Sequence, residues 1–254
     1  MYESPLVLFS FCLLMVALFE AQLAKKKHKI IYDKTQTELA IGLAIGQLLI
    51  SYTVIAFLQK LIHIPPEYKL LVLPQQSWFW GIVAFFSLDF LSYLNHRLSH
   101  AVTLFWADHA VHHANKDFNV VTHLAHGWTG FISASLAISF LMNLVGNITT
   151  VLLVYFVCAF TVQTLAHTQL IHKMGFLETF LVTPSNHRVH HAVERETHDS
   201  NYGIVFILWD KMFGTFKPEG AQPLTTFGLD NSPHLTAPLW QHAFFGWQDY
   251  FKRK

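Results

Sequence analysis

Three clusters of histidine are the features of this sequence best suited to chemistry. One is an HxxxH pair at 96–100, and two are HxxHH triplets at 109–113 and 187–191. Residues three and four apart share one face of a helix, so each cluster can direct its imidazoles toward one point. Imidazole binds iron, zinc, copper and nickel, and three such clusters predict a site for two metal ions. The candidate ligands, which are also the candidate catalytic residues, are His96, His100, His109, His112, His113, His187, His190 and His191.

The composition indicates a membrane protein. Of 254 residues, 52% are hydrophobic and 13% are charged, whereas soluble domains have about 25% charged residues. The net charge of +1 gives no indication of a nucleic-acid partner. Cys12 and Cys158 both lie in apolar stretches, so we expect small buried side chains there and neither a disulfide nor a thiolate metal site.

Five stretches approach the roughly 20 apolar residues that a helix needs to cross a bilayer. They cover residues 5–24, 39–62, 78–94, 128–145 and 148–166. The first has an acidic residue before it and lysines after it, the opposite of a signal peptide, so we expect it to be retained. Only Gly146-Asn147 separates the last two, which predicts a tight helical hairpin that either crosses the membrane or dips into it. The predicted fold is an all-α integral membrane bundle of four to five spans.

The charges predict which way this bundle faces. Five lysines within residues 25–34 follow the first span, and cytosolic loops are rich in lysine and arginine. With this loop in the cytosol, alternating spans put all three clusters on the same side, in a histidine-rich helical cap. Only Lys60 and Lys69 among the lysines and arginines then face outward. We expect a multi-pass protein of a bacterial inner membrane or the endoplasmic reticulum.

Shorter elements are expected within and beyond the cap. Short helices are predicted at 105–114 and 185–193, a loop at 220–238 and an aromatic interfacial helix at 242–254. The predicted domains are an N-terminal transmembrane part at 1–77, a metal-binding part with the hairpin at 78–217, and a C-terminal tail at 218–254.

One carboxylate lies inside a predicted span. Asp89 is seven residues before His96 and on the same helical face. A carboxylate within a membrane is energetically costly and is a functional hypothesis by default. We expect it to orient a ligand imidazole through a hydrogen bond, the alternative being a hydrogen bond to a neighbouring helix.

The sequence resembles a known family, the fatty acid hydroxylase/sterol desaturase superfamily. The resemblance covers residues 89–216, about half of the chain, with its motifs in the right order. The motifs are His96-x-x-x-His100, Trp106-Ala-Asp-His109-Ala-Val-His112-His113, Thr183-Pro-x-x-His187-Arg-Val-His190-His191, Asp199-x-Asn201-Tyr202-Gly203 and Trp209-Asp210-x-x-Phe213-Gly214-Thr215. Members are membrane-embedded di-iron enzymes that use O2 and two electrons to hydroxylate or desaturate lipids.

The resemblance extends the candidate site. It supports the eight cluster histidines as iron ligands and adds His167 and His172. Asp199 and Asn201 match family positions, and each is expected either to lie beside the cofactor or to be structural. His123 and His126 depart from the family pattern, which often continues Thr-Ala-Leu-Arg after the residue matching Asn119; either could join the site. The remaining histidines are expected to be solvated or interfacial: His28, His63, His198, His234 and His242.

The expected function is therefore a lipid hydroxylase or desaturase with two iron ions and O2 as co-substrate. Its lipid would come from the bilayer, and its electrons from a separate cytochrome b5-like, ferredoxin-like or rubredoxin-like donor. One alternative is a zinc-dependent membrane hydrolase, although no HExxH motif supplies its glutamate. The other is a metal transporter, although the histidines cluster outside the spans.

Overall fold

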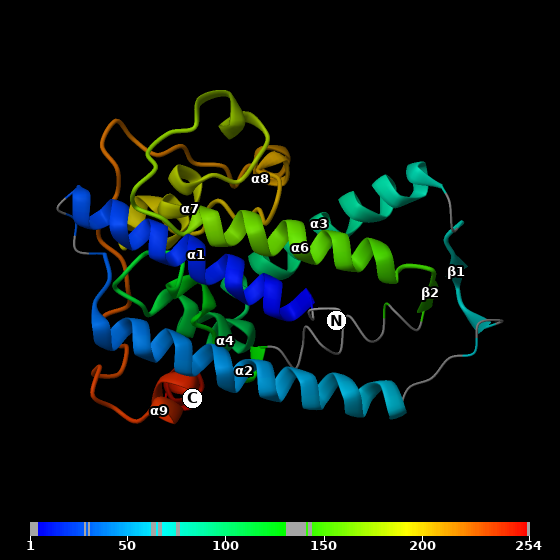
Figure 1. The fold of residues 1–254 in the computed structure, drawn as a ribbon, viewed down its shortest axis with the longest axis horizontal. Helices are drawn as coiled ribbons and strands as arrows, with labels where there is room; N and C mark the ends of the chain where they lie inside the picture. The colour runs from blue at the N-terminus through cyan, green and yellow to red at the C-terminus, as the bar shows by residue number, and fades with distance from the viewer. Residues whose placement is uncertain are drawn as a thin grey trace.

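Among the residues that the structure describes, four long helices run along the molecule, and a compact region of shorter elements lies at one end (Figure 1). The computed structural model describes residues 5–61 except 28 and 30, residue 65, and residues 68–74, 77–130, 141 and 144–252. The long helices are α1 (Pro5–Lys26), α2 (Lys34–Leu61), α3 (Trp78–Ala101) and α6 (Thr149–Ala166). Of these, α3 packs against α6.

Two of these helices have the length and hydropathy of membrane spans. Among the described residues, the segments Lys34–Leu58 of α2 and Thr149–Ala166 of α6 are long and apolar enough to cross a bilayer. Both present apolar side chains outward, such as Leu48 on α2 and Leu153 on α6, which suits contact with lipid. The stretches predicted at 5–24 and 78–94 are also helical, as parts of α1 and α3. Most of the stretch predicted at 128–145 lies outside the described residues.

The turn before α6, where the tight hairpin is predicted, contains a short strand. Strand β2 (Val145–Gly146) pairs in parallel with strand β1 (Leu71–Val72), at the end opposite the compact region (Figure 1). Asn147 follows with φ 61° and donates a hydrogen bond from its side chain to the carbonyl of Leu73 at 2.8 Å. The loop before α3 therefore holds this turn, and the described chain is mostly helical with this short strand pair.

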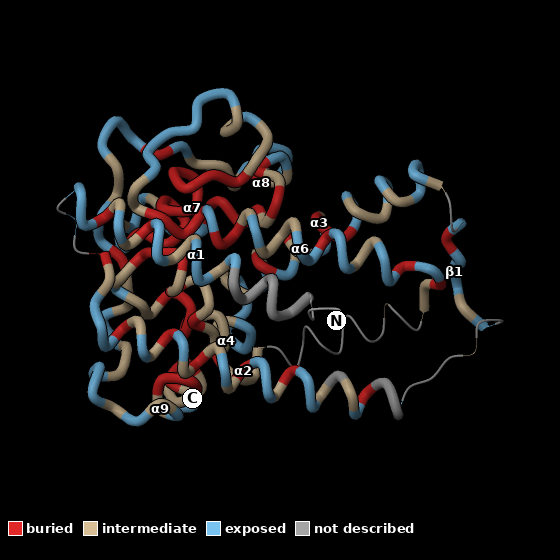
Figure 2. Tube along the Cα trace, viewed as in Figure 1, coloured by how far each residue is buried: buried red, intermediate tan, exposed pale blue. Residues whose placement is uncertain are grey.

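The compact region contains the predicted short helices. They are α4 (Thr103–His113) and α7 (Pro184–His191), close to the expected bounds. Around them lie α8 (Leu208–Phe213), α9 (Leu239–Ala243), α10 (Phe245–Lys252) and three 3-10 turns, η2 (Thr122–Leu124), η3 (Gly175–Thr179) and η4 (Arg195–Thr197). Pro184 starts α7, because its fixed φ suits the first helical position and no hydrogen-bond donor is needed there. Figure 2 shows that buried residues are concentrated around α7.

The C-terminal helix is not simply interfacial as predicted. The segment 242–254 is divided between α9 and α10, and α10 packs on α4. Gly246 permits this close approach, because a Cβ there would lie 2.1 Å from the carbonyl oxygen of Ala107. Phe245 is buried in the same contact, whereas Phe251 is exposed.

The lysine-rich loop after α1 lies at the same end as the compact region. Lys27 and Lys29 donate hydrogen bonds from their side-chain amines to the carbonyls of Leu170 and Gln169, at 3.2 and 3.1 Å. These carbonyls follow α6, close to the histidine-bearing segments. The basic loop and the histidines thus share one end of the long helices, as the charge pattern requires.

Candidate metal centre

The histidines converge into two groups that can each hold a metal ion. Within each group the potential ligand atoms all lie within 4.8 Å of one another. The first group is His96, His100, His109, His113 and His190; the second is His112, His167, His187 and His191. Nine of the ten predicted ligands are therefore brought together, from four separate segments of the chain.

The HxxHH spacing divides each triplet between the two groups. In α4, His109 and His113 are four residues apart on one face and join the first group, whereas His112 joins the second. In α7 the arrangement is reversed, because the four-apart pair joins the second group and His190 joins the first. Each triplet thus contributes two imidazoles to one group and one to the other. This predicts that the two metal ions lie close together.

Backbone carbonyls fix the orientation of four of these rings. The Nδ1 atoms of His96 and His190 lie 2.9 and 2.8 Å from the carbonyl oxygens of Tyr202 and Ser200. In the second group, His112 and His167 make the same contact with Ala125 and Gln163, at 3.2 and 2.6 Å. A carbonyl oxygen only accepts, so each Nδ1 donates and its Nε2 keeps a lone pair. Metal-binding histidines are held in this way.

Burial keeps the imidazoles neutral, as metal ligands must be. It lowers the pKa of His96 to about 4 and that of His167 to about 3, even though each donates to a carbonyl. The pKa of His112 also lies well below its ordinary value, first because of burial and then because of neighbouring histidines. The Nε2 atoms of His112 and His167 face each other at 3.2 Å. Since both Nε2 atoms carry lone pairs, they cannot hydrogen-bond to each other. A cation bound to both would satisfy both.

The spacing of the nitrogens fits a shared ion. Five pairs of Nε2 atoms lie 3.0–3.2 Å apart within the groups. Imidazole nitrogens lie about 2.1 Å from bound zinc, so two ligands at right angles are about 3.0 Å apart. The Nε2 atoms of His100 and His190 are buried and have no partner in the described part of the chain. The first group is therefore also suited to a metal ion.

A turn with unusual backbone geometry supplies two of the orienting carbonyls. Asp199 and Asn201 have φ of 55° and 56°, in the left-handed region that aspartate and asparagine tolerate. The Asn201 side-chain amide donates to the carbonyls of Asn186 and Lys217 at 2.9 and 2.7 Å. The Asp199 carboxylate accepts a hydrogen bond from the Tyr202 hydroxyl. These two residues therefore hold the turn that orients His96 and His190, and among the described residues the side-chain hydrogen bonds of both go to groups other than histidine rings.

Asp89 does not orient an imidazole, and that prediction is wrong. Its fully buried carboxylate accepts hydrogen bonds from the backbone amides of Val205 and Phe206, the Trp209 indole and the Tyr155 hydroxyl, at 2.8–3.3 Å. A buried carboxylate is most stable with several donors, and the chain leading into α8 provides three of them. Asp89 thus fastens the segment after Tyr202 to α3, so its effect on the metal groups is indirect.

We expect Asp89→Asn to destabilise the protein by about 1–3 kcal/mol, because the amide nitrogen would leave buried donors unpaired. Thermal unfolding of the detergent-solubilised protein measures this. Ser87→Ala, at an exposed site on α3, is the control and should change the midpoint little. Equal midpoints for Asp89→Asn and the unmodified protein would contradict the assignment.

Three of the histidines considered as possible ligands lie outside both groups. The side chain of His172 is 43% exposed and its Nε2 lies 3.7 Å from Glu219, so the structure does not bring this predicted ligand to either group. The ring of His126 stacks on that of His112 at 4.3 Å, with the two planes 1° apart. His123 packs against His167 with ring centroids 4.8 Å apart.

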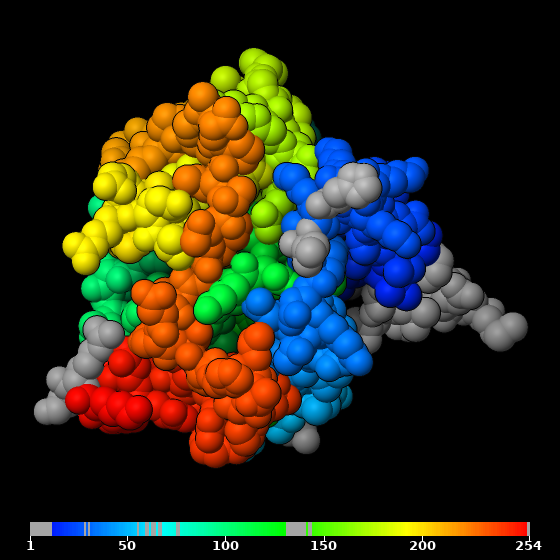
Figure 3. Space-filling view, turned by 90° about the vertical axis from the view of Figure 1, so that its left-hand side faces the viewer, coloured from blue at the N-terminus to red at the C-terminus, as the bar shows by residue number. Residues whose placement is uncertain are grey.

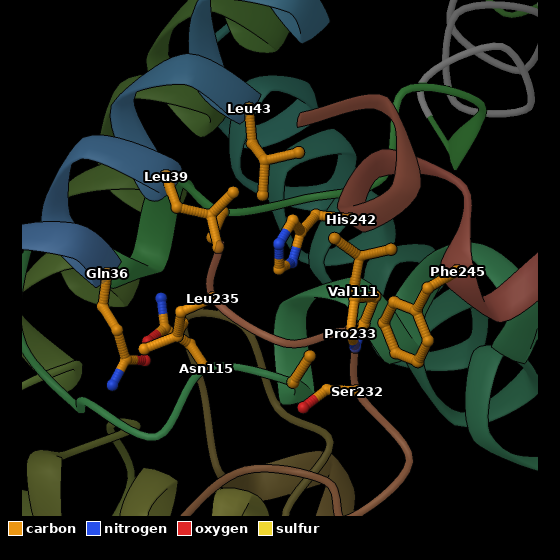
Figure 4. A pocket seen from close by; sticks show the side chains of 12 residues that line it. Gln36, Leu39, Leu43, Val111, Asn115, Ser232, Pro233, Leu235, His242 and Phe245 are labelled. Atoms are coloured by element: carbon orange, nitrogen blue, oxygen red, sulfur yellow. The ribbon is translucent and has the colours of Figure 1, made fainter. Parts of the chain in front are cut away.

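His242 is buried, contrary to the expectation of a solvated or interfacial position. Its ring points into a pocket between Leu43 of α2 and Val111 of α4 (Figure 4), and its Nε2 has no partner in the part of the chain that the structure describes. The folding of α9 against α2 accounts for this burial. His198 and His234 are exposed as expected, and His28 and His63 lie outside the described residues.

The segment between α8 and α9, residues 214–238, crosses the compact end of the molecule and is here called the strap (Figure 3). Its Phe227 stacks on Phe118, whose ring lies 5.1 and 5.2 Å from those of His167 and His191. The strap's Glu219 accepts two hydrogen bonds of 2.7 Å from Arg188 of α7. The strap thus helps to shield the second group from solvent.

Sequence reasoning missed these supporting contacts. The four orienting carbonyls carry no residue-type signal, because any residue could supply them. Glu219 lies just before the loop predicted at 220–238 and looks like a surface charge. The available signal was Arg188, a charged residue inside a histidine cluster, because burying it requires an anionic partner.

Comparison with known proteins agrees with this geometry. The fatty acid hydroxylase family profile matches residues 81–215, which include all nine grouped histidines. Alkylglycerol monooxygenase of Homo sapiens is 35% identical over 202 residues, covering 76% of this chain and 43% of that protein. The Xenopus tropicalis enzyme of the same name is 36% identical over 195 residues, covering 75% of this chain and 42% of that protein.

A bacterial relative is more distant. Ornithine lipid hydroxylase of Rhizobium tropici is 29% identical over 142 residues, covering 56% of this chain and 43% of that protein. The chain thus spans less than half the length of these relatives, and no solved structure matches it. The profile covers more than half of the chain, with the histidine clusters in the family order. This chain therefore belongs to the fatty acid hydroxylase family.

Proposed function

We propose that this chain is a di-iron lipid hydroxylase that uses O2 and electrons from a separate donor. The facing Nε2 atoms of His112 and His167 carry the proposal. Their Nδ1 atoms donate to carbonyls, so both Nε2 atoms have lone pairs, and a cation bound to both would relieve the arrangement. The first group would hold one ion and the second group the other. Bound iron would supply the activation of O2 that oxidation of an unactivated C–H bond requires.

The protein's own residues provide position and exclusion of water. The carbonyls of Tyr202 and Ser200 hold two ligands of the first group, and those of Ala125 and Gln163 hold two of the second. Phe118 and the strap keep water from the second group, which limits the escape of reactive oxygen species. Asp89 fixes the chain leading from Tyr202 to α8.

The substrate in this proposal is a membrane lipid with an alkyl chain and a polar head. Both α3 and α6 end at the metal groups, so a lipid lying along them would bring its reactive carbon to the histidines. The names of the relatives make an alkylglycerol the first lipid to test and an ornithine lipid the second. Hydroxylation, as in both names, is proposed over desaturation.

The proposed arrangement places the histidine groups on the cytosolic side of a multi-pass protein. The lysines after α1 share the histidines' end of the helices, and cytosolic loops favour positive charge. A cytochrome b5-like, ferredoxin-like or rubredoxin-like protein would then deliver electrons at that end.

The buried carboxylates favour the proposed oxygenase over a zinc-dependent hydrolase. Neither group contains a carboxylate, and the buried Asp89, Asp210 and Glu219 already accept hydrogen bonds from other parts of the chain. A hydrolytic zinc site needs a free general base beside its bound water.

Metal removal is the direct test of the proposed function. Protein made with ample iron and purified in detergent is expected to contain about two iron ions per chain. With alkylglycerol, a reductant system and isotopically labelled O2, the product should gain one labelled oxygen atom. A chelator should abolish turnover and added Fe(II) should restore it, whereas zinc should not. Stoichiometric zinc, together with no oxygen consumption after iron loading, would contradict the proposal.

A further inference from the structure

The two metal groups have unequal numbers of histidines. The first group has five and the second has four, although both are built from HxxHH triplets of the same spacing. His172, the expected additional ligand, has a partly exposed side chain beside Glu219. Among the described residues, the second group therefore lacks an imidazole that the first group has.

His123 lies where an additional imidazole of the second group would be. Its ring centroid is 4.8 Å from that of His167 and 6.3 Å from that of His112. Both separations occur between members of the first group, where His100 and His109 are 4.8 Å apart and His109 and His190 are 6.3 Å apart. The ring of His123 is thus spaced from two second-group ligands as first-group ligands are spaced from one another.

His123 also has an unpaired nitrogen close to the second group. Its Nδ1 is buried and has no hydrogen-bond partner in the part of the chain that the structure describes. Buried polar atoms without partners are rare and need an explanation such as an ion. Three members of the metal groups, His100, His187 and His190, each have such a nitrogen, and so does His242, which lies outside both groups. The unpaired nitrogen therefore supports a metal role for His123 only together with its ring spacing from His167 and His112.

The backbone under His123 is held firmly. His123 lies in η2, where the Asn119 side-chain oxygen accepts hydrogen bonds from the amides of Val121 and Thr122, both at 3.0 Å. The Asn119 amide in turn donates to the carbonyl of Ile31. This buried network fixes the backbone, so the side chain of His123 can rotate while its Cα stays beside the second group.

We propose that His123 is the fifth ligand of the second metal ion. The inference rests on the metal centre of the proposed function. His123 is not among the residues whose ligand atoms all lie within 4.8 Å of one another, so its ring is expected to turn toward the ion on binding. It would then supply a further imidazole of the kind predicted for His172.

Metal binding, not turnover, is the test. The unmodified protein, His123→Ala and the matched control His172→Ala are loaded with Fe(II), and iron per chain is followed as chelator is added. The unmodified protein and His172→Ala should release both ions at similar chelator concentrations. His123→Ala should keep one ion as tightly as the unmodified protein. It should release the other at a chelator concentration at least about 10-fold lower, because even the loss of a residue that supports a ligand weakens metal affinity by about 10-fold or more.

A second variant gives a positive signal at the same position. His123→Cys would bring a thiolate to the ion, and oxidation to Fe(III) should then produce a thiolate-to-iron charge-transfer absorption band. The unmodified protein is the control, because its cysteines, Cys12 and Cys158, are free and belong to neither metal group. Tryptophan fluorescence during thermal unfolding checks that both variants are folded.

The outcomes separate this inference from the proposed function. If the unmodified protein binds no iron, the proposed function fails. If it binds two ions, and His123→Ala holds both equally tightly while His123→Cys shows no new band, only the inference is overturned. An altered KM for the lipid with unchanged iron binding would instead assign His123 to substrate contact, and it too would overturn the inference.

Discussion

His112→Ala is expected to abolish the proposed lipid hydroxylation while the protein remains inserted in the membrane. Its Nε2 faces that of His167 at 3.2 Å, and its Nδ1 is held by the carbonyl of Ala125. Alanine removes one of the four histidines of the second group, so the remaining imidazoles should no longer hold the ion that they would share. Turnover should fall to the background of protein treated with chelator, and iron should fall from about two ions per chain to about one.

His190→Ala tests the first group in the same way. His190 has a buried Nε2 without a partner and is the only contribution of α7 to that group. Here too we expect loss of turnover and of about one ion, so each variant should retain the ion of the other group. His172→Ala is the control and should keep both ions and near-normal turnover. Substantial activity in either ligand variant would contradict the assignment of the groups.

The sequence was most informative where chemistry depends on spacing within a helix. The four-residue spacing of His109 and His113 places both on one face of α4, so their convergence on one ion needs no knowledge of the fold. Likewise, the helices at 103–113 and 184–191 follow from local pattern and from the proline at 184. The apolar stretches that become α2 and α6 are equally local signals.

Contacts between distant segments could not be predicted in this way. Asp89 lies on the same helical face as His96, yet its partners come from the chain near residue 205, more than 100 residues away. The burial of His242 depends on how α9 folds back on α2. His172 was expected in the site because of the resemblance, whereas its place beside Glu219 depends on the path of the strap.

The ion pair of Arg188 and Glu219 is expected to be the contact outside the metal groups whose loss destabilises the protein most. The guanidinium makes two hydrogen bonds of 2.7 Å with the carboxylate, and the side chains are 1% and 0% exposed. Arg188 also donates to the carbonyls of Thr168, Ile171 and His172. One residue thus joins α7, the chain after α6 and the strap.

Glu219→Ala should therefore lower the free energy of unfolding by about 3–5 kcal/mol, because it leaves the Arg188 charge buried without its counter-ion. Thermal or denaturant unfolding in detergent measures this loss. Lys34→Ala is the matched control: it breaks the exposed Lys34–Glu38 pair, whose side chains are 88% and 66% exposed. Water and salt screen that pair, so its loss should change stability by about 1 kcal/mol or less.

The position of Arg188 also predicts which metal ion is bound less tightly in Glu219→Ala. It lies between His187 and His191 on α7, both of which belong to the second group. When Glu219 no longer holds Arg188, α7 and the strap should loosen together, and Phe227 should no longer keep Phe118 against His191. Glu219→Ala should then release the second ion to chelator before the first, whereas Lys34→Ala should release both as the unmodified protein does. Equal stability and equal metal retention in the two variants would show that the buried pair does not hold the strap over the metal centre.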